Sequence, residues 1–339
     1  MKRVFLFLML IFTACQPSGD PVNQTKFDRT AFLKNYAEKF IIPGYGNFLS
    51  QLELLKASLS DKEASRTQWI NTYEAFLQIN AFNLGPAEEQ VIQKSLTEEI
   101  ATFPVKVSVI NEKLNSGNFG FDDFQRDTRG LLALEYLLFD ENVQALPNHQ
   151  EYIQACLNDI IRRVSEVSTA WGTYSEEFIN NDGTSAGSST SALYNEFLKS
   201  FEALKNFKLG LPLGLRPGQT VAVPENIEAR FSGQSLTFAL ADFESIKNIW
   251  KGTNNLGFKD YLLTVEGGEA LVLATEAQIL NVEAAFEACS NSDFDVSNLD
   301  QNTNLIQLHT ELQKLTRYFK SDMSSILGIA ITFSSGDGD

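Results

Sequence analysis

Residues 149–179 read HQEYIQACLNDIIRRVSEVSTAWGTYSEEFI, and this stretch decides the fold class. Its apolar residues recur every three or four positions, a spacing that places them on one face of an α-helix. The stripe consists of Ile153, Cys156, Leu157, Ile160, Ile161, Val164 and Val167. A long helix with one apolar face has to bury that face against other helices. The stretch therefore predicts a helical bundle.

Helical spacing also runs through most of the remaining chain. It predicts a long helix over 27–60, which Pro43 should kink or break because proline cannot donate the i→i−4 hydrogen bond. Further helices are predicted at 61–84, 87–101, 104–115, 121–139, 191–207, 225–231, 235–250, 256–263, 267–289 and 298–327. The Gly- and Pro-rich stretch 208–224 is not expected to form a regular helix, and a short β pair near 208–223 is one alternative for it.

One polar segment interrupts the series of predicted helices. Residues 180–190 read NNDGTSAGSST and show no apolar periodicity, as is typical of a loop. The sequence therefore predicts an all-α fold of two helical bundles packed together. The N-terminal bundle is expected to cover 27–180 and the C-terminal bundle 190–339.

The first residues, MKRVFLFLMLIFTAC, have the organisation of an export signal. A short basic start precedes an apolar run that is too short to span a bilayer. Small residues before Cys15 resemble a bacterial lipobox. We expect residues 1–14 to be a cleaved signal peptide, Cys15 to carry a lipid, and residues 15–26 to form a flexible tether. An ordinary signal peptide followed by an incidental cysteine is the alternative.

Acidic residues dominate the charge of the chain. There are 27 Lys and Arg residues against 43 Asp and Glu residues, a net charge of −16. Removal of the signal takes away Lys2 and Arg3, which leaves 25 basic against 43 acidic residues and a net charge of −18. Such a surface repels nucleic-acid phosphates and anionic lipid headgroups. We therefore expect no nucleic-acid partner, and membrane attachment through the lipid on Cys15 rather than through charge.

Two cysteines remain after the signal, and their pairing is open. Cys156 and Cys289 both stand among apolar residues in helical patterns. Buried free thiols are one interpretation, and a disulfide in an oxidising compartment is the other.

Five segments, in chain order, are similar to the imelysin-like family of bacterial envelope proteins, also called the M75 peptidase family. They are Ile42-Pro43-Gly44-Tyr45, Trp69 followed by Phe82 and Gly85-Pro86, the stretch 130–139 (GLLALEYLLF), the stretch 208–214 (KLGLPLG) and the terminal Asp337-Gly338-Asp339. The resemblance covers nearly the whole chain after the tether. It implies two helical bundles, a location in the cell envelope and a link to iron uptake or iron regulation. We expect the lipid anchor to lie in the outer membrane, with the protein facing the periplasm or the cell surface.

The stretch 130–139 resembles the family signature Gly-x-His-x-x-Glu. On a helix, a His and a Glu three residues apart share one face and can hold a metal ion together. In this chain Leu132 occupies the histidine position, and a leucine side chain has no lone pair to donate. Glu135 is therefore the one remaining candidate metal ligand, and iron or another divalent cation is the cofactor that the resemblance implies.

The predicted ligand site consists of Gly130, Glu135, Trp69 and Tyr73. Glu135 has two interpretations, because a carboxylate among leucines is costly unless it is paired. It could be a buried structural acid bonded to a Lys, Arg, Tyr or backbone donor of another helix. It could instead form the wall of a residual site that faces a cleft between the bundles.

Other polar candidates are few. His149 is expected at a helix start or in an exposed position, and His309 on a solvated helix face. No His-Glu-x-x-His motif of zinc metallopeptidases occurs in the sequence. Lys208, Arg216 and Tyr73 are residues that could line a polar pocket.

Three hypotheses for function follow. The first is a non-catalytic binding protein that acts beside iron or haem uptake proteins. The second is a structural or partner-binding protein whose metal site has decayed. The third is a metallopeptidase of the M75 type, which the substitution of the histidine by Leu132 disfavours; no catalytic residue is assigned.

Overall fold

The computed structural model describes residues 27–88, 94–121, 124–216, 218–290, 294 and 299–333. All regular elements in these residues are helical, and the described part of the chain contains no strand. The all-α prediction is confirmed, and the short β pair considered near 208–223 is wrong for the residues described there. The signal, Cys15, the tether and Asp337-Gly338-Asp339 lie outside the described residues.

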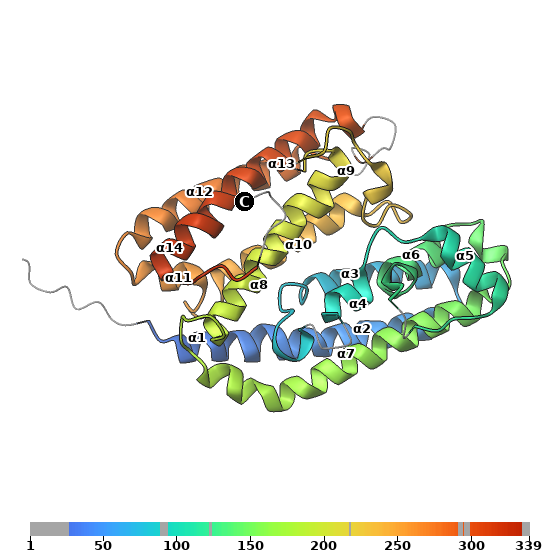
Figure 1. Cartoon of the computed structure of the whole chain (residues 1–339), viewed down its shortest axis with the longest axis horizontal. Helices are drawn as coiled ribbons and strands as arrows, with labels where there is room; N and C mark the ends of the chain where they lie inside the picture. Colours follow the sequence, from blue (N-terminus) through green and yellow to red (C-terminus); the bar gives the residue numbers. More distant parts are fainter. Residues whose placement is uncertain are drawn as a thin grey trace, which may run out of the picture.

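The helices form two groups, one above the other in Figure 1. The first comprises α1 (Arg29–Tyr36), α2 (Ile42–Ser58), α3 (Lys62–Leu77), α4 (Leu96–Ala101), α5 (Val107–Ser116), α6 (Gly130–Phe139) and α7 (His149–Asn180). The second comprises α8 (Ser189–Ala203), α9 (Leu211–Leu213), α10 (Ser235–Lys251), α11 (Phe258–Leu263), α12 (Gly268–Glu287), α13 (Thr303–Thr316) and α14 (Met323–Leu327). Residues 181–188 connect the two groups and contain no helix. Whether each group folds by itself as a domain stays a prediction.

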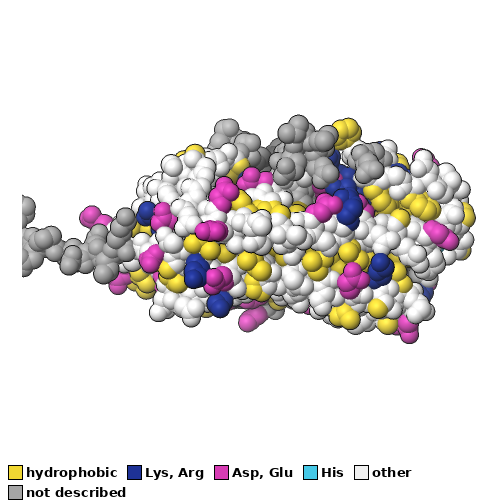
Figure 2. All heavy atoms as spheres, turned by 90° about the horizontal axis from the view of Figure 1, so that it is seen from below, with side chains coloured by type: hydrophobic (Ala, Val, Ile, Leu, Met, Phe, Trp, Pro, Cys, Tyr) yellow, Lys and Arg dark blue, Asp and Glu magenta, His cyan; other side chains and the backbone are white. Residues whose placement is uncertain are grey.

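Helix α7 runs along the whole first group, and α2 and α6 pack against it (Figure 1). Its predicted apolar stripe is buried from Ile153 to Val167, with the sole exception of Ile161, which is partly buried. Figure 2 views the molecule from below Figure 1, and acidic and basic side chains are interspersed with apolar ones on this face. In the described residues, no helix combines the length and apolar character needed to cross a bilayer.

The predicted break at Pro43 is a local widening of the helix. A π-helical segment, Ala37–Ile41, joins α1 to α2, and Pro43 lies in the first turn of α2. A proline clashes with the carbonyl group four residues earlier, and a π turn is one way to relieve that crowding. The chain therefore continues in the same direction through this point, as α1 and α2 do in Figure 1.

Several predicted helices are shorter than their apolar spacing indicates. The helix expected at 87–101 is Leu96–Ala101, the one at 104–115 begins at Val107 rather than at Pro104, and the one at 121–139 begins at Gly130. The helix expected at 225–231 is a single 3₁₀ turn, Pro224–Asn226. In the opposite direction, a π-helical segment Leu204–Gly210 and α9 carry α8 on to Leu213, where Gly214 ends it with φ +71°.

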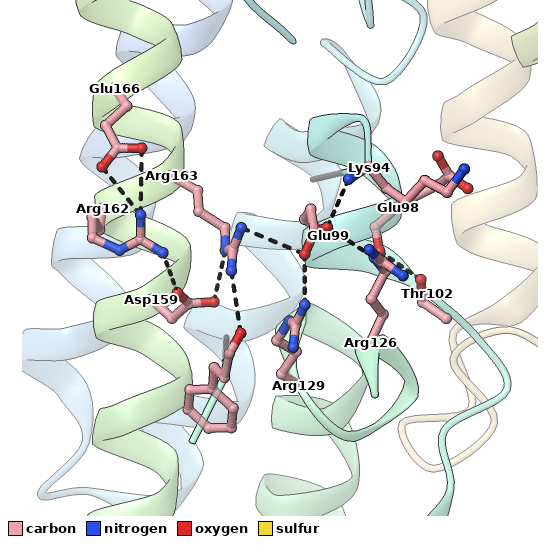
Figure 3. Close-up of polar contacts among 11 residues, drawn as sticks. Lys94, Glu98, Glu99, Thr102, Arg126, Arg129, Asp159, Arg162, Arg163 and Glu166 are labelled. Carbon is pink, nitrogen blue, oxygen red and sulfur yellow. Dashed lines mark hydrogen bonds and ion pairs between the residues drawn. The ribbon is translucent and has the colours of Figure 1, made fainter. Parts of the chain in front are cut away.

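An ion-pair cluster joins α4 to α7 and to the segment that leads into α6 (Figure 3). The Glu99 carboxylate is buried and accepts Arg126 Nε at 2.8 Å and Arg129 Nη2 at 2.6 Å, and Arg163 Nη1 of α7 lies 3.4 Å away. Burial alone would raise the pKa of Glu99, but the two bonded guanidinium groups lower it below its ordinary value. Arg163 also pairs with Asp159 at 2.9 Å. This cluster fixes the segment that precedes α6.

The two cysteines of the described chain are not paired with each other. Cys156 is buried on α7 and Cys289 is partly buried just after α12, and neither forms a disulfide. Burial raises the pKa of Cys156, so its thiol stays protonated. The structure therefore contains no disulfide between Cys156 and Cys289.

Candidate functional site

Gly130 begins α6 for a steric reason. Its φ is +82°, a conformation that side chains with a Cβ rarely adopt. A Cβ at this position would lie 2.3 Å from the carbonyl oxygen of Ile100, at the end of α4. The glycine therefore permits the close approach of α4 and α6.

Leu132, at the position of the signature histidine, is part of the hydrophobic core. Its side chain is 2% exposed, and it packs among the other buried leucines of α6. An aliphatic side chain in this position fills space and offers no ligand atom. The two-point metal chelate of the signature therefore cannot form in this chain.

Glu135 is a buried acid whose partners are backbone amides. Its side chain is 1% exposed, and the amide N–H of Ser232 donates to Oε1 at 2.7 Å. Ser232 lies in the loop before α10, so this bond joins the two helix groups. Burial raises the pKa of Glu135 to about 7, although hydrogen bonds from Ser232 and Phe231 oppose the rise. Of the two interpretations, the contacts match a structural acid bonded to a backbone donor.

Trp69 and Tyr73 lie on α3, beside α6. The indole Nε1 of Trp69 donates to the carbonyl oxygen of Leu131 at 2.9 Å. The two aromatic rings stack with their centroids 5.2 Å apart. The hydroxyl of Tyr73 donates to Oε1 of Glu228 at 2.6 Å, and Glu228 comes from the second helix group. All four predicted ligand-site residues thus belong to two neighbouring helices, α3 and α6.

The contact between the groups contains further buried charges. Lys208 Nζ lies 2.9 Å from Asp242 and 3.2 Å from Glu228, and all three side chains are buried. Burial alone would lower the pKa of Lys208, but the two carboxylates raise it above its ordinary value. We call Tyr73, Glu135, Lys208, Glu228 and Asp242 the seam cluster. It holds three acids and one lysine, so a proton on Glu135 reduces its excess of negative charge.

Sequence reasoning found part of the seam cluster. It named Glu135, Tyr73 and Lys208, but it missed Glu228 and Asp242. Asp242 could have been identified from the sequence as a buried acid, because it lies on the same helix face as the apolar Phe238 and Ile246. Arg216, the third member of the polar pocket considered, instead has its guanidinium 4.5 Å from the ring centroid of Phe207.

The described residues do not fit a resident metal. They contain no group of three or more His, Cys, Asp or Glu side chains that could hold a metal ion. His149 is buried rather than exposed, at the start of α7, and its Nε2 lies 2.9 Å from the carbonyl oxygen of Leu137. His309 is half-buried rather than solvated, and burial lowers its pKa to about 4.

These features define an all-helical protein whose two helix groups meet at a buried polar cluster. The chain matches the family model of imelysin, peptidase family M75, over residues 48–319, and it therefore belongs to the imelysin family. The family prediction is confirmed.

Solved structures show the same fold. An imelysin-like protein from Psychrobacter arcticum 273-4 superposes with a TM-score of 0.70 at 18% sequence identity, and the match covers 90% of this chain and 97% of that one. The protein named a putative iron-regulated protein A precursor, from Parabacteroides distasonis ATCC 8503, superposes with a TM-score of 0.67 at 16% identity and the same coverage. At these identities the likeness shows the fold alone. No curated protein matches the chain.

Proposed function

We propose that this chain is a non-catalytic binding protein of the bacterial cell envelope, held by a lipid on Cys15 and associated with iron or haem acquisition. Membership of the imelysin family supports the link to iron, as does the name of the Parabacteroides relative. The signal and the cysteine that follows it support export and anchoring in the outer membrane.

The observation that carries the non-catalytic part is the side chain of Leu132. A metallopeptidase needs a metal to activate water and polarise the scissile carbonyl group. Leu132 is packed in the core at the place of a metal ligand, and Glu135 is bonded to Ser232 instead. The metal-binding pair of the signature is therefore incomplete.

Calorimetric titration of the mature protein with iron(II), iron(III) and haem tests the binding role. We expect affinity tighter than millimolar for one of them. Because Glu135 is bonded within the seam, Glu135→Gln should leave that affinity within about twofold. If the protein bound none of iron(II), iron(III) and haem, the proposed binding role would be wrong. Cleavage of casein that a chelator abolishes would overturn the non-catalytic part.

The second candidate is a structural or partner-binding protein with a decayed metal site. The ion pairs within the seam cluster favour this candidate, because Lys208 already pairs with both Glu228 and Asp242. If the site has decayed by loss of the histidine alone, Leu132→His should give about tenfold or greater gain in zinc affinity over the parent. The double variant Leu132→His/Glu135→Gln is the matched control and should lose the gain. No gain in the single variant would contradict a site that Leu132 alone disabled.

A further inference from the structure

The solvent-facing side of α12 is apolar. Helix α12 packs against α13 in the second helix group, and its inner side belongs to the hydrophobic core (Figure 1). On its outer side, Leu273 is 67% exposed and Leu280 is 64% exposed. A helix that is apolar on both sides is typical of a buried position. The outer side of α12 therefore indicates a surface that another molecule covers.

The exposed apolar residues of α12 form one stripe. They recur at alternating intervals of three and four positions, which places them on one face of the helix: Ala270, Leu273, Ala277, Leu280 and Ala284. We call these five residues the α12 stripe. Its spacing is that of the a and d positions of a coiled coil, in which the apolar residues of one helix pack between those of another.

The neighbouring helix α13 shows that such a stripe is not a general feature of this bundle. Helix α13 buries its apolar leucines, and its exposed residues are all polar or charged: Thr303, Asn304, Gln307, Thr310, Gln313 and Lys314. Single exposed leucines are common on protein surfaces, but an exposed row of five apolar residues marks an interaction surface more often.

A row of glutamates borders one edge of the α12 stripe. Glu269, Glu276 and Glu283 recur every seven residues, and each directly precedes an alanine of the stripe. Glu287 continues the row one turn further on. In a coiled coil this is the g position, whose side chain lies beside the partner helix and contributes to the choice of partner.

The inner glutamates of the row are paired within the chain, and the outer ones are not. Glu276 lies 3.3 Å from Lys259. Glu283 pairs with Lys247. The two outer glutamates are exposed, and they have no hydrogen-bond or ion-pair partner in the part of the chain that the structure describes. The row rises about 27 Å from its first glutamate to its last, so a free negative charge lies near each end of the stripe.

The charged edge disfavours a second copy of this chain as the partner. In a coiled coil, the edge residues of one helix face those of the other. An antiparallel second copy would place one glutamate row against the other. A parallel second copy would place the row against the opposite edge, which consists of Ala274 and Asn281 and offers no positive charge. Both arrangements leave the outer glutamates without a counter-charge.

A lipid surface does not match these charges either. Helices that lie on a membrane carry Lys and Arg beside their apolar face. Helix α12 carries glutamates there, and anionic lipid headgroups repel them. A partner helix with an apolar face and a basic edge matches both the stripe and the row of glutamates.

We propose that the α12 stripe docks an amphipathic helix of a partner protein, with bulky apolar residues against the stripe and Lys or Arg against the outer glutamates. The alanines of the stripe leave space for larger side chains of the partner, and Leu273 and Leu280 pack between them. The partner helix needs about five turns, with a basic residue near each end. Helix α12 contributes no residue to the seam cluster, so this proposal and the iron or haem role can fail separately.

Fluorescence anisotropy with a labelled synthetic helix tests this surface. The probe is a peptide of about three heptads with leucine at a and d and lysine at e and g, and its acidic counterpart has glutamate at e and g. The mature chain carries Cys15→Ser, so that neither lipid nor detergent covers the stripe. At physiological ionic strength we expect the lysine peptide to bind tighter than about 100 μM, and the glutamate peptide at least about tenfold more weakly.

Two double variants separate the stripe from its charged edge. Leu273→Asn/Leu280→Asn should weaken binding of the lysine peptide at least about tenfold. Glu269→Lys/Glu287→Lys should weaken it about fivefold and should strengthen binding of the glutamate peptide. Leu54→Asn changes a leucine of α2 that is 51% exposed. It is the matched control and should bind the lysine peptide as the parent does.

Three results would overturn the proposal. One is no binding of the lysine peptide at about 1 mM. Another is equal binding by the parent and the double leucine variant, because attraction to the overall negative charge would then explain the signal. The third is self-association, or binding to phosphatidylcholine vesicles, that the double leucine variant loses, because a second copy or a lipid surface would then cover the stripe. Circular dichroism checks that each variant is folded.

Discussion

Leu132 and Glu135 lie three residues apart on α6. Because leucine stands at the histidine position of the signature, the carboxylate of Glu135 has a different role. With a histidine at the first position, the acid would be half of a chelate. With leucine there, the acid is a buried group bonded by backbone amides across the seam. The same carboxylate thus joins two helix groups in this chain.

The raised pKa of Glu135 predicts a particular dependence of stability on pH. Because its pKa is about 7 in the folded protein and about 4.5 when unfolded, the folded state binds the proton more tightly. The stabilisation that the protonated Glu135 contributes to the free energy of unfolding is therefore fully present below about pH 4.5, and it is lost as the pH rises through 7. Glu135→Gln keeps an acceptor for the amide of Ser232 and cannot ionise. Relative to the parent, it should gain up to about 3 kcal/mol in free energy of unfolding between pH 5 and pH 8.

Urea unfolding at a series of pH values measures this difference. Glu112→Gln, which removes an exposed acid, should show a constant difference from the parent over the same range. A constant difference for Glu135→Gln as well would contradict a raised pKa at the seam.

At the scale of elements, the junction of α4 and α6 is the tightest point near the candidate site. Gly130→Ala should destabilise the protein by at least about 2 kcal/mol, because alanine disfavours φ +82° and its Cβ would meet the Ile100 carbonyl oxygen. Thermal unfolding followed by circular dichroism measures the effect. Gly172→Ala, at a helical position of α7 with open space around a Cβ, should instead stabilise by about 0.5–1 kcal/mol. Equal effects of the two substitutions would refute the steric role of Gly130.

The cluster around Glu99 predicts a second large decrease in the free energy of unfolding. Glu99→Gln removes the charged carboxylate between Arg126 and Arg129 and leaves Arg129 buried. We therefore expect the free energy of unfolding to fall by about 3–5 kcal/mol. Glu166→Gln breaks an exposed pair with Arg162 and should cost less than about 1 kcal/mol. Denaturant titration compares the two. A loss below about 1 kcal/mol for Glu99→Gln would show that the cluster does not hold α4.

Apolar spacing predicted the long helices well and the short ones poorly. The prediction of 149–179 matches α7, and that of 235–250 matches α10, because each buries one continuous face. It failed around α4 and the start of α6. There, ion pairs of Glu99 with distant arginines and the positive φ of Gly130 determine the path of the chain, and neither has a local apolar pattern.

The packing of the two helix groups completes the site, and for this reason the sequence identified three of the five seam-cluster residues. Glu135 and Lys208 lie in stretches that resemble the family, and Tyr73 lies one helical turn from Trp69. Glu228 lies in the stretch 225–231, where the sequence predicts a helix and the chain forms the 3₁₀ turn Pro224–Asn226 instead, and Ser232 follows that stretch. Both residues reach the site because the second helix group packs on the first. No local pattern connects positions that are 97 residues apart, as Glu135 and Ser232 are, or 155 residues apart, as Tyr73 and Glu228 are.

The envelope location also concerns the whole molecule. If Cys15 carries the lipid, Cys15→Ser should move the protein from the membrane fraction to the soluble fraction and remove labelling by a fatty-acid analogue. Cell fractionation with metabolic labelling measures both. Cys289→Ser, at a partly buried thiol of the folded part, should keep the label. A labelled Cys15→Ser protein would contradict the anchor.

The central claim is that Glu135 holds the seam together and does not hold a metal. Calorimetric titration of the mature protein and of Glu135→Gln with iron(II) tests it most directly. We predict the same affinity for both proteins, because the acid is already bonded to the amide of Ser232. A metal bound tightly by the parent and released by Glu135→Gln would contradict the account.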